Sequence, residues 1–89
     1  MHEEAMLRDL RRKIVQVGEQ EGGHRILRVS LWVGALAHVD EAQLRSRWPQ
    51  TVEGTLAEGA RLTVSTSPDA TDPRAQGIVL TDVAVERGD

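Results

Sequence analysis

Apolar residues recur near the start of the chain at the spacing of one helical face. Within residues 3–20 they lie three or four positions apart, at Met6, Leu7, Leu10, Ile14 and Val17. This spacing predicts an amphipathic helix that Gly22 and Gly23 bring to an end. The opposite side carries Arg8, Arg11 and Arg12. We interpret these arginines as a solvated face, and Glu3 and Glu4 stand at the helix end that favours negative charge.

Residues 25–33 alternate instead between apolar and polar positions. One face would hold Leu27, Val29, Leu31 and Val33, and the other Arg28, Ser30 and Trp32. This period of two predicts a strand with one buried side, on whose polar face Trp32 either covers the back of the sheet or awaits a partner. Residues 60–65 and 78–86 alternate in the same way and predict two further strands.

A second helix is predicted after Asp40, which can cap its first turn with Gln43 as the reciprocal half of a capping box. Its inner side would be formed by Leu44, Trp48, Thr51 and Val52. Pro49 lies inside this segment and removes one backbone donor, so it should kink or shorten the helix. Gly54 is the expected end of the helix.

The last two predicted strands are separated by residues 65–76, which are polar and hold two of the three prolines. This composition predicts an exposed loop. In the strand that follows, the inward spacing slips by one near Thr81 and Asp82, which indicates a β-bulge. The order helix, strand, helix, strand, strand packs most simply as an α+β fold with two helices on one face of a three-stranded sheet. We expect a single domain over residues 1–89.

Composition excludes several classes of function. The chain has no cysteine, which excludes disulfides, thiolate metal sites and cysteine nucleophiles. With 11 basic and 14 acidic residues its net charge is −3, which argues against nucleic acid as the main partner. The longest apolar run, residues 31–37, is too short to cross a membrane, and the charged start is unlike a signal peptide. We therefore expect a soluble cytoplasmic protein, and the absence of a nucleophile elbow or phosphate-binding loop indicates that it is not an enzyme.

The first three residues, Met1, His2 and Glu3, form the strongest candidate site. The α-amine of Met1, the backbone nitrogen of His2 and the His2 imidazole can close two fused chelate rings around one metal ion. This planar, nitrogen-rich geometry suits Ni(II) or Cu(II) rather than Zn(II) or Mg(II). Taken alone, a histidine in second place is more often incidental. His38 with Asp40 offers a second arrangement, for which a surface histidine beside a helix cap is the simpler interpretation.

Three stretches of sequence, together with the order of the elements, resemble the HypA/HybF family of nickel-insertion proteins for NiFe-hydrogenase maturation. The stretches are residues 1–3, 27–36 and 54–62, and the last is the most specific of them. The resemblance implies that Met1, His2 and Glu3 form a nickel site that holds Ni(II) transiently. It implies as partners a HypB-type maturation GTPase and the precursor of the hydrogenase large subunit.

Asp40 would act beside this site as a second-shell acceptor for His2. Members of the family carry a zinc domain with paired Cys-x-x-Cys motifs between the last two strands, whereas this chain has only the loop 65–76 there. We therefore expect no zinc, and a shortened nickel-binding domain that is a monomer or a weak dimer. The leading hypothesis is a metallochaperone-like protein that assists Ni(II) insertion. The alternative is an adapter that docks on the maturation partners without delivering metal.

Overall fold

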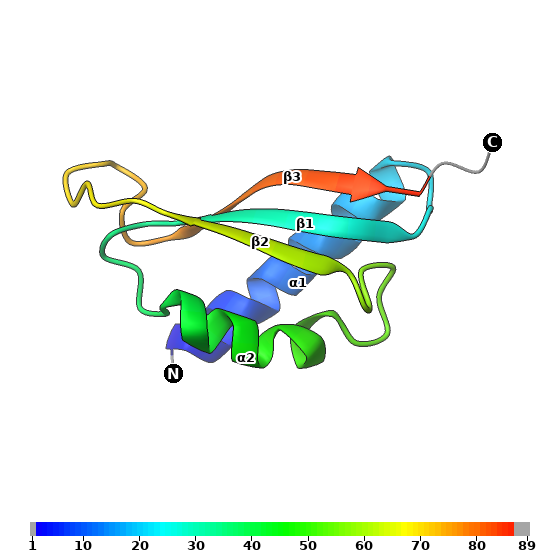
Figure 1. Ribbon diagram of the computed structural model, residues 1–89, viewed down its shortest axis with the longest axis horizontal. Coiled ribbons are helices and arrows are strands. Elements are labelled where there is room, and N and C mark those ends of the chain that lie inside the picture. Colours follow the sequence, from blue (N-terminus) through cyan, green and yellow to red (C-terminus); the bar gives the residue numbers. More distant parts are fainter. Residues whose placement is uncertain (1, 87–89) are drawn as a thin grey trace.

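The computed structural model describes the backbone of residues 2–86 and the side chains of residues 4–86. Its elements are α1 (His2–Gln20), β1 (Ile26–Val33), α2 (Glu41–Val52), β2 (Arg61–Thr66) and β3 (Ile78–Val85). This order confirms the predicted α+β succession (Figure 1). None of the helices in the described part of the chain is both long and apolar enough to cross a bilayer.

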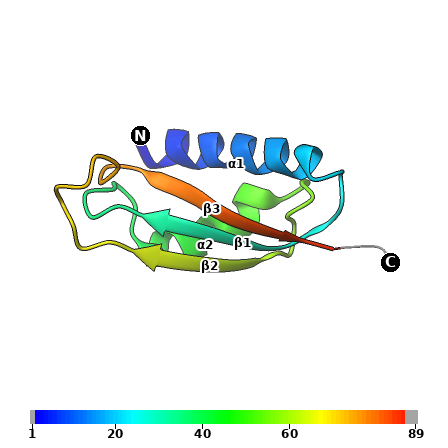
Figure 2. The ribbon, with the colours of Figure 1, turned by 90° about the horizontal axis from the view of Figure 1, so that it is seen from above.

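The three strands form one mixed sheet with β1 in the centre, in the order β2-β1-β3. β1 pairs with β2 in parallel and with β3 antiparallel. A parallel pair needs a crossover connection, and α2 provides it here. α1 follows the length of the sheet on the β3 side (Figure 2), and in the view of Figure 1 α2 lies below the strands while α1 runs obliquely behind them.

A single aliphatic core lies between the helices and the inner face of the sheet. α1 contributes Leu7, Leu10 and Ile14, and α2 contributes Leu44, Trp48 and Val52. Trp48 is the one aromatic side chain of this core, and its indole nitrogen donates to the carbonyl of Ala60 at 3.1 Å. The predicted inner side of α2 is therefore confirmed, and the burial of Thr51 agrees with it.

The inner face of β1 differs from the prediction at its first position. Val29, Leu31 and Val33 are buried as expected, but Leu27 is 48% exposed and Ile26 takes its place in the core. The pairing of β1 with β3 shifts register between Ile26 and Arg28. Because one irregular residue reverses the faces of all residues before it, strict alternation pointed to the wrong neighbour.

Both helix ends agree with the sequence. The amide of Gly23 donates to the carbonyl of Gly18 at 2.9 Å and that of Gly22 to Glu19 at 3.2 Å, which is the Schellman pattern of a helix end. Gly22 has a φ of 97°, a conformation that favours glycine. α2 continues through Pro49 to Val52, so the proline does not end the helix.

The loop between β2 and β3 is mostly exposed, as predicted, but Ser67 and Asp72 are half-buried and one residue is fully buried. Ala75 is buried, and its carbonyl accepts from the amide of Leu36 at 2.8 Å. Gly34 lies so close to Ala75 that a Cβ at position 34 would overlap with the Ala75 carbonyl. The predicted bulge in β3 is confirmed, because the register skips Thr81 between Asp82 and Leu80.

Candidate metal centre

The predicted nickel site lies at the very start of α1. Met1 and the side chains of His2 and Glu3 lie outside the described residues, so their geometry is not part of the structure. The backbone of His2 and Glu3 is helical, and α1 begins at His2. Amide groups in the first turn of a helix have no acceptor within that helix. The backbone nitrogens that the chelate requires are therefore not engaged in the hydrogen bonds that hold α1 together.

Glu4 is the first residue of α1 whose side chain is described. It is exposed, and its carboxylate lies 3.8 Å from the guanidinium of Arg8, one turn along the helix. A carboxylate in the first turn offsets the partial positive charge of the helix end. Glu4 thus contributes negative charge immediately beside the predicted site.

Asp40 is the N-cap of α2, as the sequence predicts. Its Oδ1 accepts from the amide of Gln43 at 2.8 Å, and the Gln43 side chain accepts from the Asp40 amide at 3.0 Å. The carboxylate is exposed, and its Oδ2 has no hydrogen-bond partner among the described residues. Asp40 therefore has one oxygen committed to the helix cap and one that faces solvent.

α1 and α2 begin at the same end of the molecule. Arg11 on α1 bonds to Thr51 and Glu53 at the end of α2, whereas Glu4 shares a groove with Arg47, earlier in α2. The start of α1 therefore lies toward the Asp40 end of α2. Figures 1 and 2 agree, since the N-terminus and the start of α2 lie toward the same end in both views.

The other two histidines, His24 and His38, belong to no group of three potential metal ligands among the described residues. His24 is exposed in the turn after α1, at the opposite end of the helix from His2. His38 is exposed in the connection before Asp40. Across the part of the chain that the structure describes, no three His, Cys, Asp or Glu side chains form a group that could hold a metal ion.

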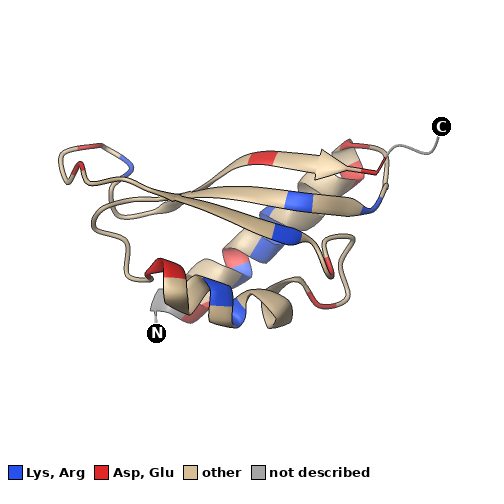
Figure 3. Ribbon diagram, viewed as in Figure 1, with Lys and Arg blue, Asp and Glu red and all other residues tan. Residues whose placement is uncertain are grey.

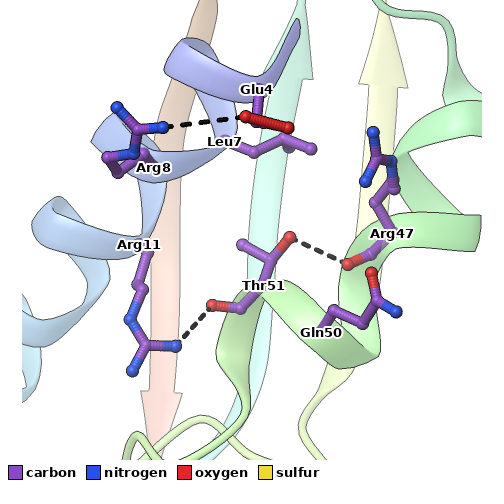
Figure 4. Close-up of a pocket in the computed structure, with 7 residues that line it drawn as sticks. All are labelled: Glu4, Leu7, Arg8, Arg11, Arg47, Gln50 and Thr51. Atoms are coloured by element: carbon purple, nitrogen blue, oxygen red, sulfur yellow. Dashed lines mark hydrogen bonds and ion pairs between the residues drawn. The ribbon is translucent and has the colours of Figure 1, made fainter.

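A feature that the sequence did not predict is a groove between the two helices, which we call the interhelix groove. It has a volume of about 220 Å³ and is lined by Glu4, Leu7, Arg8 and Arg11 of α1 and by Arg47, Gln50 and Thr51 of α2 (Figure 4). The Arg11 guanidinium donates through Nη1 to the carbonyls of Thr51 and Glu53, at 3.0 and 2.7 Å. Arg11 therefore connects the helices, which corrects its interpretation as part of a solvated face.

Trp32 and the loop before β3 meet on the outer side of the sheet. The Arg74 guanidinium lies 4.7 Å from the centre of the Trp32 ring, within the range of a cation–π contact. Trp32 is half-buried. It therefore covers the outer face of the sheet and does not stand exposed without a contact.

Two carboxyls of this loop have altered acidity. Bonds from the Thr71 hydroxyl and then the Thr71 amide hold the pKa of Asp69 below its usual value. The Arg74 guanidinium, followed by its amide, does the same to the pKa of Asp72. Both groups are at the surface and far along the chain from the predicted metal site, so they stabilise the turns of the loop.

Comparison with known proteins gives one consistent result. The family model described as "Hydrogenase/urease nickel incorporation, metallochaperone, hypA" matches residues 1–73. The hydrogenase maturation factor HypA of Azorhizobium caulinodans is 38% identical over 64 residues, which cover 72% of this chain and 57% of that protein. HypA of Chlorobaculum tepidum is 36% identical with the same coverage. HybF of Salmonella typhimurium is 35% identical over 68 residues, 76% of this chain and 60% of that protein. The chain thus spans somewhat more than half the length of these curated relatives.

Proposed function

Because the chain belongs to the HypA family of hydrogenase and urease nickel-incorporation proteins, we propose that it binds Ni(II) at Met1, His2 and Glu3. It then assists insertion of the ion into the large subunit of a NiFe hydrogenase, in the cytoplasm and together with a HypB-type GTPase. The family is one of metallochaperones, not of enzymes. The observation that carries the proposal is the match of the family model from the first residue of the chain.

The chemistry of the donors fits this cargo. The Met1 amine, the His2 backbone nitrogen and the His2 imidazole supply nitrogen ligands of the kind that Ni(II) accepts in planar geometry. The start of α1 at His2 supports the proposal, since first-turn amides have no acceptor in the helix and their nitrogens are available. Glu3 contributes its backbone nitrogen, and its carboxylate screens the cation.

Release of the ion follows from the same donors. Free α-amines of peptides titrate at about pH 7.7–8.0, so protons compete with Ni(II) for the Met1 amine near neutrality. The affinity is therefore intermediate, and a receiving protein can take the ion when a proton displaces it from the amine. We expect nickel affinity to fall as the pH is lowered from 8 toward 6.

Asp40 orients the His2 ring in this proposal. Its solvent-facing Oδ2 accepts a hydrogen bond from the His2 imidazole and thereby orients the ring. The shared position of both helix starts at one end of the molecule supports this role.

We further propose that residues 1–89 form one nickel-binding domain in which the loop 65–76 stands where relatives carry a zinc domain. The chain contains no cysteine, so it has no thiolate for a zinc site. The Asp69 and Asp72 turns and the burial of Ala75 give this loop an ordered conformation of its own.

Isothermal titration with NiCl₂ tests the metal site. The untagged protein with a free Met1 amine should bind one Ni(II) per chain at pH 7.5, and His2→Ala should abolish this binding. His24→Ala is the matched control, since His24 is an exposed histidine at the far end of α1. Undiminished binding by His2→Ala, or equal losses in both variants, would rule the proposal out.

The second candidate function is an adapter that docks on the maturation proteins without carrying metal. The loop 65–76 motivates it, because the chain has no cysteine and thus lacks the thiolates of the family's zinc domain. A pull-down with the GTPase and the large-subunit precursor, combined with a hydrogenase assay in cells, separates the two. The metallochaperone loses hydrogenase maturation with His2→Ala, whereas the adapter retains both partner binding and maturation.

A further inference from the structure

The interhelix groove concentrates positive charge at the surface of an acidic protein. Among the described residues, Arg8, Arg11 and Arg47 line it together with Glu4, although the whole chain carries a net charge of −3. Figure 3 shows basic segments on both helices. A groove of this charge attracts carboxylate-bearing ligands more strongly than the rest of the surface does.

The arginines of the groove are suited to exchange partners. Arg8 is ion-paired with Glu4 at 3.8 Å, and both side chains are largely exposed, at 68% and 72%. Exposed pairs of this kind contribute little to stability, so a ligand carboxylate can replace Glu4 at Arg8. Arg11 is held in position by two bonds that both use Nη1, and no described residue accepts from its Nη2.

The groove also has an apolar component. Leu7 lies in it between the two helices, and the Thr51 side chain lines it beside Arg11 (Figure 4). A guanidinium binds a carboxylate through paired, directed hydrogen bonds, and an aliphatic ligand side chain beside the carboxylate can rest on Leu7. The groove therefore suits a peptide that carries both carboxylate and aliphatic side chains.

We propose that the interhelix groove binds an acidic peptide segment of the protein that receives the nickel. This inference rests on the proposed function, because Glu4 at the rim of the groove directly follows the predicted nickel residues. A segment seated there brings its carboxylates close to the start of α1, where they can receive the ion. The groove thus orients the recipient before transfer.

Fluorescence anisotropy on the metal-free protein tests the inference. The probe is a fluorescein-labelled peptide of alternating glutamate and leucine, and its counterpart has glutamine in place of glutamate. Arg8→Glu should weaken binding of the acidic probe by about tenfold, which corresponds to about 1.4 kcal/mol. Binding should also weaken as salt is raised.

Arg12→Glu is the matched control. Arg12 belongs to the same helix, is 73% exposed and forms a comparable ion pair with Asp9 at 3.3 Å, but it does not line the groove. Binding to this variant should change by less than about twofold, the difference expected from net charge alone. Equal losses in both variants, equal binding of the glutamine peptide, or no binding of the acidic probe at all would overturn the inference.

Two further measurements separate this inference from the metal site and from other polyanions. Arg8→Glu should bind Ni(II) like the parent, since the groove supplies no nickel ligand. A failure of the nickel titration leaves the peptide result standing, because the peptide assay contains no metal. A fluorescein-labelled oligothymidine that binds as tightly as the acidic peptide, with the same loss in Arg8→Glu, would assign the groove to nucleic acid and contradict the proposal.

Discussion

At the scale of single residues, the sequence predicts best those roles that depend on near neighbours. The Asp40 and Gln43 capping box follows from a spacing of three, and the structure confirms it. Arg11 could not be interpreted in the same way, because its partner carbonyls lie 40 and 42 positions away along the chain. Contacts of that kind depend on how α1 and α2 cross, which no local pattern specifies.

The observed role of Asp40 as a helix cap and its proposed role beside His2 can be separated by substitution. Asn caps helices as well as Asp does, so Asp40→Asn should retain the free energy of unfolding, whereas Asp40→Ala should lower it by about 1 kcal/mol. Loss of the acceptor charge should weaken nickel binding by about tenfold in both variants. Urea unfolding and nickel titration measure the two effects, and unchanged nickel affinity in Asp40→Asn would remove Asp40 from the site.

Gly34 is required by a close approach of two segments. A Cβ at this position would overlap with the Ala75 carbonyl, which is backbone and also accepts from Leu36. Gly34→Ala should therefore lower the free energy of unfolding by about 1–3 kcal/mol in urea. Gly77→Ala is the control, since a Cβ there would meet its nearest neighbour at an ordinary 3.7 Å. Equal stability of the two variants would contradict this packing.

At the scale of elements, periodicity predicted the existence and type of every helix and strand. α1 begins and ends within one residue of the predicted helix. The bulge at Thr81 lies where the alternation of apolar residues in the sequence shifts by one. The prediction that Leu27 faces the core was wrong, because strict alternation assumes an unbroken register and the β1–β3 pairing is irregular there. The burial of Ala75 was missed because its neighbours in the loop are polar.

The loop before β3 should respond to acid. The pKa values of Asp69 and Asp72 are lowered in the folded chain, so both carboxylates stabilise the loop above their unfolded pKa of about 3.9. That contribution is lost as the pH falls through the lowered, folded pKa. In a pH series of amide NMR spectra, the Thr71 and Arg74 signals should therefore titrate below the usual range of aspartate. Midpoints at or above the usual value would contradict the hydrogen bonds described.

At the scale of the whole molecule, one core and one sheet unite the part of the chain that matches the family model with a strand beyond it. The family model ends at residue 73, yet β3 lies beyond it and pairs along the length of β1. Ile78, Leu80, Val83 and Val85 of β3 pack against the common core. The place of β3 in the fold is therefore given by its pairing with β1 and its packing on the core, not by the family match. The nickel ligands remain a prediction from sequence, because Met1 and the side chains of His2 and Glu3 lie outside the described residues.

A fold built in this way should not depend on metal. The chain has no cysteine, and its stability comes from the aliphatic core between the sheet and both helices. Dialysis against EDTA should therefore leave the Tm in a circular dichroism melt unchanged within error. A marked drop in Tm that zinc restores would reveal a structural metal site and refute the single-domain account.

The central claim is that the start of the chain is the nickel site, and its most direct test changes nothing but that start. A short Gly/Ser extension before Met1 removes the free amine from the chelate and leaves every side chain of α1 in the sequence. Isothermal titration at pH 7.5 should give one bound Ni(II) per chain for the protein that starts at Met1, and none of comparable affinity for the extended protein. Equal affinity of the two proteins would contradict the account.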